Sequence, residues 1–204
     1  MKNTDLNSFI NLDFHVQNII IVAEKICPLS WNYKPKDPRS NHSIVYVLDG
    51  RAKYTILHSD LNSSNMSIND GDNNDEFEVQ KGNIQFFPKG SHYKILGDAT
   101  QNFHFLVVNF EFDSETDINL LPIQNSYKPI HSHLLESLFT ELLNIWFRKS
   151  ILYKAKCTSI LQNIICSIFE DAFEAKMHTS KLPKIQSALE YMDEVYNKPL
   201  KISK

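Results

Sequence analysis

A turn-rich stretch at residues 81–93, KGNIQFFPKGSHY, most constrains what this chain can fold into. Its first glycine predicts a tight turn, and the apolar IQFF segment that follows predicts a short strand. Pro88 and Gly90 then predict a second sharp turn, which brings His92 to the start of another strand. Two turns so close to one short strand indicate a corner in a β-barrel.

The glycines divide the chain into two parts. All five lie between Gly50 and Gly97, whereas residues 130–182 contain neither glycine nor proline. The first part holds many short strand candidates separated by turn signals, which is typical of a barrel or jelly roll. The second part is expected to be helical, so the predicted fold class is α+β.

Two helices are predicted at residues 131–149 and 153–175 because apolar residues recur there at three- and four-residue spacing. Each apolar stripe is wider than one neighbouring element needs. One side can cover the barrel and the other can contact a second copy of the chain, although both sides could also be used within one chain. The residues predicted for a homodimer interface are Leu135, Leu138, Leu142, Trp146, Ile160 and Ile164.

The length and net charge of the chain limit its expected cellular location and its expected binding partners. The 204-residue chain has no apolar run long enough to span a bilayer and no secretory signal at its start, so we expect a cytoplasmic protein without membrane contact. A net charge of -3 gives no electrostatic reason for nucleic-acid binding by these residues. Any DNA binding is therefore expected to come from elsewhere.

The spacing of Gly82, Pro88, Gly90 and His92 resembles the second signature of the cupin β-barrel. Together with HSIVYVLDGRAK at residues 42–53 and NFHFLVVNFEF further on, it resembles the N-terminal effector domain of the AraC family of bacterial transcription regulators. The resemblance implies a cupin-like barrel at residues 1–125 that binds a small-molecule effector. It also implies a helix pair at residues 130–178 that forms a homodimer.

The tail is the second part of this resemblance. Residues 184–196, KIQSALEYMDEVY, carry one apolar face, and the KPLKISK that follows is similar to the opening of the AraC-family DNA-binding domain. Residues 181–204 are thus expected to be a linker and a C-terminal helix, the first helix of a truncated helix-turn-helix domain. DNA would then be contacted only through a domain beyond residue 204.

Metal-dependent cupin enzymes hold their metal with two histidines and a glutamate from the first signature and one histidine from the second. Here His92 fills the second signature one residue closer to the glycine, while Ser43 stands where the glutamate belongs. Pro38 and Ser40 replace the histidine pair, and only His42 remains nearby. His42 and His92 are weak metal candidates, so we expect no metal, no cofactor and no enzymatic activity. A metal-dependent isomerase or dioxygenase remains the alternative.

A metal-free barrel can instead offer a cavity lined by aromatic and polar groups. Strand alternation places Tyr46 on the same face as Ile44 and Leu48, and His104 on the same face as Leu106 and Val108. If these faces point inward, Tyr46 and His104, with Tyr93 after the turn, would bind a sugar or similar polar metabolite.

Three further residues complete the predicted ligand site. Asp49 ends its strand and could anchor a hydroxyl or a cation, and the AraC resemblance implies effector contacts at Asp49 and Tyr93. Trp31 and Arg39, in a polar loop, could roof the site. Each of these residues could equally be barrel core or rim, and the chain could equally be a stand-alone sugar-binding module.

Overall fold

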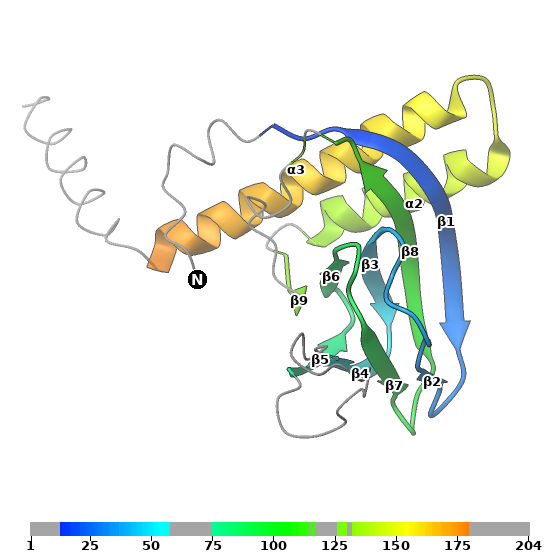
Figure 1. Ribbon diagram of the computed structural model, residues 1–204, viewed down its shortest axis with the longest axis vertical. Helices are drawn as coiled ribbons and strands as arrows, with labels where there is room; N and C mark the ends of the chain where they lie inside the picture. Colours follow the sequence, from blue (N-terminus) through cyan, green and yellow to red (C-terminus); the bar gives the residue numbers. More distant parts are fainter. Residues whose placement is uncertain (1–12, 58–74, 115, 117–125, 130–131, 180–204) are drawn as a thin grey trace, which may run out of the picture.

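The computed structural model describes residues 13–57, 75–114, 116, 126–129 and 132–179. Nine strands precede two helices in this part of the chain (Figure 1). The strands are β1 Val16–Cys27, β2 Asn32–Tyr33, β3 His42–Asp49, β4 Arg51–Ile56, β5 Glu76–Gln80, β6 Ile84–Phe87, β7 Tyr93–Gly97, β8 Phe103–Phe112 and β9 Ser126–Tyr127. The helices are α2 Ser132–Arg148 and α3 Tyr153–Thr179.

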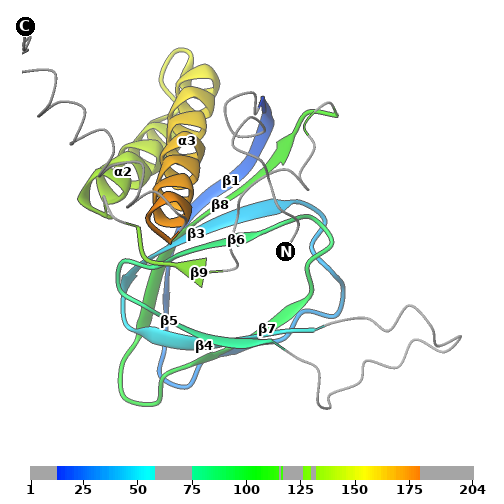
Figure 2. The same ribbon diagram turned by 90° about the vertical axis from the view of Figure 1, so that its left-hand side faces the viewer.

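The strands form two antiparallel sheets that face each other, with both helices outside one of them (Figure 2). One sheet has the order β1-β8-β3-β6-β9 and the other β2-β7-β4-β5, so neighbours in space are often far apart in sequence. The predicted α+β class, a cupin-like barrel followed by a helix pair, is confirmed. The expected C-terminal helix and the tail at residues 181–204 lie outside the described residues.

Strand β3 is buried on both of its faces, because it lies between two apolar clusters. Val45 and Val47 face the second sheet, whereas Ile44 and Tyr46 face the helices. The neighbouring strand β8 divides in the same way, with Phe105 facing the second sheet. This alternation makes the first sheet a shared wall between the barrel interior and the helix layer.

The helices α2 and α3 pack against each other and against the first sheet (Figure 1). Four residues predicted for a dimer interface are buried in this core of a single chain: Leu135, Leu142, Ile160 and Ile164. Their assignment to an interface between chains is wrong, because the sheet and the partner helix already cover them. Leu138 and Trp146 are half-buried against the same core.

The predicted corner at residues 81–93 is confirmed. Gly82 has a positive φ of 84° and donates its N–H to the carbonyl of Val47 at 2.8 Å. In the second turn, Ser91 donates to the carbonyl of Pro88 at 3.1 Å. The corner thereby fixes where β7 begins, and with it the position of Tyr93.

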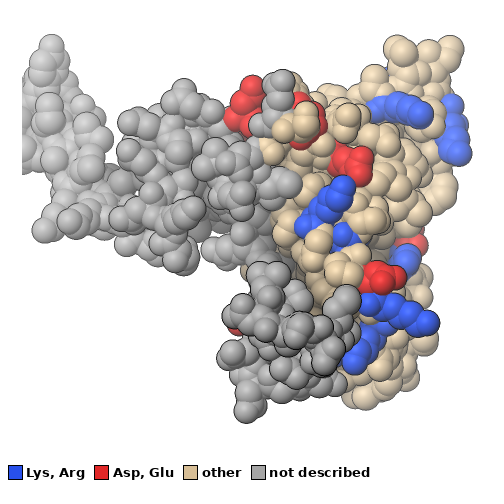
Figure 3. Space-filling view, viewed as in Figure 1, with Lys and Arg blue, Asp and Glu red and all other residues tan. Residues whose placement is uncertain are grey.

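Charged residues of both signs are interspersed on the face shown in Figure 3. Among the described residues, Arg51 and Asp98 form an ion pair at 3.5 Å. The described part of this face therefore shows no continuous basic surface of the kind that nucleic-acid phosphates require. Within the described residues, neither helix is long and apolar enough to cross a membrane.

Candidate functional site

A cavity of about 140 Å³ lies inside the barrel, with walls from both sheets. Three residues predicted for the ligand site, Trp31, Arg39 and Tyr93, line it together. The other lining residues are Ile21, Ala23, Lys25, Tyr33, Ser43, Val45, Tyr54, Ile95, Phe105, Val107 and Asn109. Most of this wall is apolar or aromatic with a few polar groups, as in small-molecule sites.

Arg39 is the centre of the polar part of this cavity. Its Nη1 donates to the Tyr93 hydroxyl oxygen and its Nη2 to Asn109 Oδ1, each at 2.7 Å. Longer contacts, at 3.3 and 3.4 Å, join the guanidinium to Asn41. The backbone of Arg39 is fixed as well, because its N–H donates to Ser91 and its carbonyl accepts from Gly90, both at 2.9 Å. The corner turn therefore positions the arginine.

Tyr93 presents a neutral hydroxyl to the cavity. Burial raises the pKa of Tyr93, and Arg39 only partly offsets this effect. The phenol thus stays protonated near neutral pH, and since its oxygen accepts from Arg39, its own O–H proton remains available to a ligand.

Two polar residues that sequence reasoning missed, Ser43 and Asn109, also line the cavity from paired positions on β3 and β8. Ser43 is fully buried, and its hydroxyl has no hydrogen-bond partner among the described residues. Asn109 must turn its oxygen toward Arg39, because arginine only donates. Asn109 interrupts an apolar run in β8 and Ser43 precedes one in β3, but His104 interrupts β8 in the same way and faces away from the cavity, so this signal alone would not have identified them.

Aromatic rings form a second part of the cavity wall. Trp31 stacks on Tyr33 with ring centroids 5.7 Å apart and lies 6.2 Å from the Phe105 ring. Tyr33 in turn lies 6.4 Å from Tyr93. Because Trp31, Tyr33 and Arg39 all lie between the end of β1 and the start of β3, this one segment supplies both apolar surface and charge.

Three other predicted ligand residues lie elsewhere, and the predicted inward faces of β3 and β8 are wrong. Tyr46 faces α2, where its hydroxyl donates to Glu136 Oε2 at 3.2 Å. His104 also lies on the side away from the cavity, with its Nε2 2.7 Å from Glu24 Oε1. Asp49 is exposed at the end of β3. The side chains alternate along β3 and β8 as predicted, but the set of side chains that was predicted to face the cavity lies on the other face of the sheet.

The two weak metal candidates make hydrogen bonds to the backbone. Nδ1 of the buried His42 accepts from the N–H of Lys89 at 3.0 Å, so this nitrogen is unprotonated. His92 Nε2 lies 3.1 Å from the carbonyl oxygen of Pro35 and therefore donates to it. Among the described residues, no group of three or more His, Cys, Asp or Glu side chains converges as a metal site would require.

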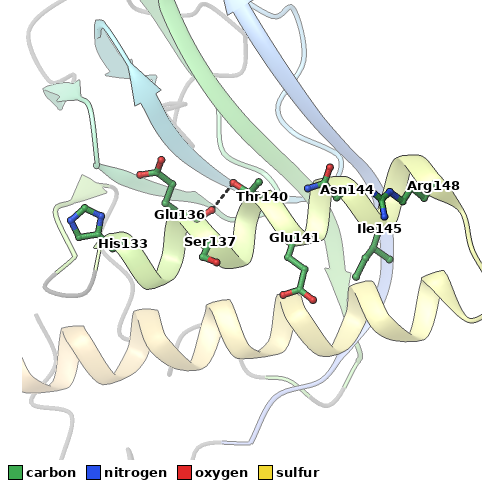
Figure 4. A pocket seen from close by; sticks show the side chains of 8 residues that line it. All are labelled: His133, Glu136, Ser137, Thr140, Glu141, Asn144, Ile145 and Arg148. Atoms are coloured by element: carbon green, nitrogen blue, oxygen red, sulfur yellow. Dashed lines mark hydrogen bonds between the residues drawn. The ribbon is translucent and has the colours of Figure 1, made fainter.

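A larger hollow of about 680 Å³ runs along α2 (Figure 4). All its lining residues belong to this one helix, and Glu136 and Glu141 point in different directions from it. The Glu136 carboxylate is already engaged by Tyr46, and its carbonyl accepts from Thr140 at 2.8 Å. This surface is an open groove, so the barrel cavity is the better candidate site.

No protein-family model matches the sequence, and no curated protein does. Solved structures similar to this chain include vicilin from hazelnut (Corylus avellana), with 14% identity and a TM-score of 0.34 over 47% of this chain and 22% of vicilin. The polyketide cyclase RemF from Streptomyces resistomycificus matches at 19% identity and a TM-score of 0.35, over 46% of this chain and 55% of RemF. The Cnp3 cupin domain of Schizosaccharomyces pombe matches at 15% identity and a TM-score of 0.35, over 50% of this chain and 63% of that domain chain.

Proposed function

We propose that this chain is the effector-binding region of an AraC-type bacterial transcription regulator, and that its barrel cavity binds a small polar metabolite. One observation carries the proposal: Arg39, Tyr93 and Asn109 form a hydrogen-bonded cluster on the wall of an otherwise apolar cavity. A few fixed polar groups in an apolar wall give a ligand both affinity and orientation. In this role the protein is a sensor that needs no catalytic group and no cofactor.

The strand β3 supplies a route from the cavity to the helices. Ser43 and Val45 line the cavity, while Tyr46, on the other face of the same strand, stacks on Phe139 and donates to Glu136 of α2. A ligand that shifts β3 would also move these contacts. Binding can then favour one of two arrangements of the helix layer.

The proposal also includes a homodimer formed through the helix layer. With four of the predicted interface residues buried in one chain, the end of α2 and the turn that follows it supply the contact, because Phe147, Ile151 and Leu152 are 67%, 87% and 70% exposed there. Sedimentation should show a dimer that Ile151→Asp dissociates. Ile26→Asp, at an equally apolar exposed site on β1, should leave it intact. A monomeric wild type would refute this part.

DNA contact belongs to the proposal through the AraC resemblance of residues 181–204. The coding sequence beyond residue 204 tests it: two helix-turn-helix units there would support the regulator, and a stop codon would refute it. Metal analysis of protein purified without chelator separates this proposal from a metal-dependent cupin enzyme, which requires stoichiometric metal.

Thermal unfolding in the presence of small metabolites tests the sensor itself. A ligand at about one hundred times its Kd stabilises the folded state by about 2.7 kcal/mol, which raises the Tm of a chain this size by roughly 5–10 °C. Tyr93→Phe removes one hydroxyl from the cavity and should weaken binding about 2- to 10-fold. Tyr127→Phe removes the same group from β9, which does not line the cavity, and should leave affinity unchanged. Equal effects of the two variants would place the ligand outside the cavity.

A further inference from the structure

We propose that the ligand of the barrel cavity is a small organic anion, a monocarboxylate with a flat apolar body. This inference rests on the proposed function, since it assigns a chemical class to the metabolite that the cavity binds. It comes from the balance of donors and acceptors, the charge of the lining residues and the size of the cavity.

Hydrogen-bond donors predominate in the polar part of the cavity. The Arg39 guanidinium has five N–H groups and no acceptor, and its hydrogen bonds to the described residues leave one N–H on Nη1 unused. The Tyr93 oxygen accepts from Arg39, so its O–H proton can only go to another acceptor. A ligand that offers acceptors without competing donors fits both groups, and a carboxylate is such a ligand.

Two more donors face the same space from the neighbouring strands. Asn109 directs its oxygen to Arg39, and none of the described residues accepts from its amide N–H groups, so these can donate to a ligand. The buried Ser43 hydroxyl, which has no partner among the described residues, lies at the position paired with Asn109. A buried hydroxyl without a partner is unfavourable, so a ligand oxygen at this point would satisfy it.

The charges of the lining residues also favour an anionic ligand. Arg39 and Lys25 are cations, and none of the described residues that line the cavity is acidic. Among the described residues, Arg39 bonds only to neutral groups, the hydroxyl of Tyr93 and the amides of Asn41 and Asn109. A half-buried guanidinium whose described partners are all neutral gains most from an anion, which it can bind through charge-assisted hydrogen bonds.

Size and shape define the rest of the ligand. The cavity volume of about 140 Å³ is close to the roughly 150 Å³ of a protein cavity that binds benzene. Trp31, Tyr33 and Phe105 offer ring faces beside the polar cluster. A body of about one six-membered ring can therefore lie on these rings while its carboxylate reaches Arg39.

Titration calorimetry on the unmodified protein tests this inference with matched pairs of probes. Acetate, propionate, benzoate and cyclohexanecarboxylate are each compared with their own amide, which has nearly the same shape but no charge. We expect at least one ring carboxylate to bind about 10-fold or more tightly than its amide, and acetate to bind more weakly than benzoate. If no carboxylate exceeds its amide, the inference is overturned.

Variants locate the bound anion. Arg39→Gln should weaken carboxylate binding about 10- to 100-fold, as expected for loss of a charged hydrogen-bond donor, and should bring it close to the amide. Ser43→Ala should weaken it a few-fold without lowering the Tm, because the hydroxyl has no partner to lose. Arg51→Gln, at an exposed arginine paired with Asp98, is the control and should change nothing. Equal losses in Arg39→Gln and Arg51→Gln would overturn the site.

The proposed function and this inference fail in different ways. If amides or other neutral metabolites bind in the cavity as tightly as carboxylates, and Tyr93→Phe weakens them, the sensor role stands and the anion assignment falls. If neither the carboxylates nor the broader set of metabolites binds, both are refuted.

Discussion

Gly50 is the position at which we expect a single methyl group to destabilise the barrel most. Its φ is +82°, and a Cβ there would lie 2.0 Å from the backbone oxygen of Asn102. An alanine in this left-handed conformation costs about 1–2 kcal/mol. In addition, two backbone segments must separate until this contact reaches at least 3.4 Å, and such overpacking typically costs about 1–3 kcal/mol. Gly50→Ala should thus lower the free energy of unfolding by about 2–5 kcal/mol.

Substitutions at two other glycines measure the cost of the positive φ and the cost of a close contact separately. Gly82 has nearly the same φ, +84°, but no atom within 4 Å of its would-be Cβ, so Gly82→Ala should cost only about 1–2 kcal/mol. Gly97 has no positive φ, and its Cβ would meet the Trp31 backbone nitrogen at 3.2 Å, so Gly97→Ala reports a tight contact alone. Urea unfolding with linear extrapolation measures all three. If Gly50→Ala and Gly82→Ala are equally stable, the contact between a Cβ at residue 50 and the Asn102 oxygen adds no cost, and the reasoning is refuted.

Two further predictions concern groups on the helix side of the first sheet. Tyr46→Phe should lower the free energy of unfolding, measured in urea, by about 0.5–1.5 kcal/mol, because the hydrogen bond to Glu136 is lost. Burial and the Glu136 carboxylate raise the pKa of Tyr46 to about 12, so the hydroxyl keeps its proton and the effect should be the same at any pH near neutral. Burial lowers the pKa of His42, so the unfolded chain binds a proton at this residue more readily than the folded chain does. The free energy of unfolding should therefore fall as the pH drops below about 6.5, by up to about 1.4 kcal/mol per pH unit. His42→Gln should flatten this pH dependence between pH 7 and 5, and an unchanged slope would mean that another group titrates.

Much of the fold could be predicted because its signals are local. The corner at residues 81–93 follows from the conformational needs of its glycines and proline, and these do not depend on distant contacts. The two helices follow from apolar periodicity at residues 131–149 and 153–175 in the same way. Which partner covers each helix face was not predictable, because an apolar stripe has the same composition whether a sheet or a second chain lies on it.

The candidate site could be predicted only in part, for a different reason. An alternating strand reveals its inner face only when the other face is polar, and β3 and β8 are apolar on both. A phase error of one residue then exchanges every side chain between the two faces, which is why Tyr46 and His104 were assigned to the cavity. By contrast, Trp31 and Arg39 come from a loop, and their placement did not depend on strand phase.

Three polar residues of these apolar strands lie on the face toward the barrel interior. Asn109 on β8 pairs with Ser43 on β3, and Gln85 on β6 pairs with Val45, so all three face the barrel interior. Ser43 and both amide atoms of Gln85 are buried without a hydrogen-bond partner among the described residues. Burying such groups is costly in a core that only has to be stable, and it is favoured where a ligand completes them. Ser43 and Asn109 thus mark the cavity side of β3 and β8, whereas His104, a polar residue of β8 that faces away from the cavity, shows that polarity alone does not fix the strand phase.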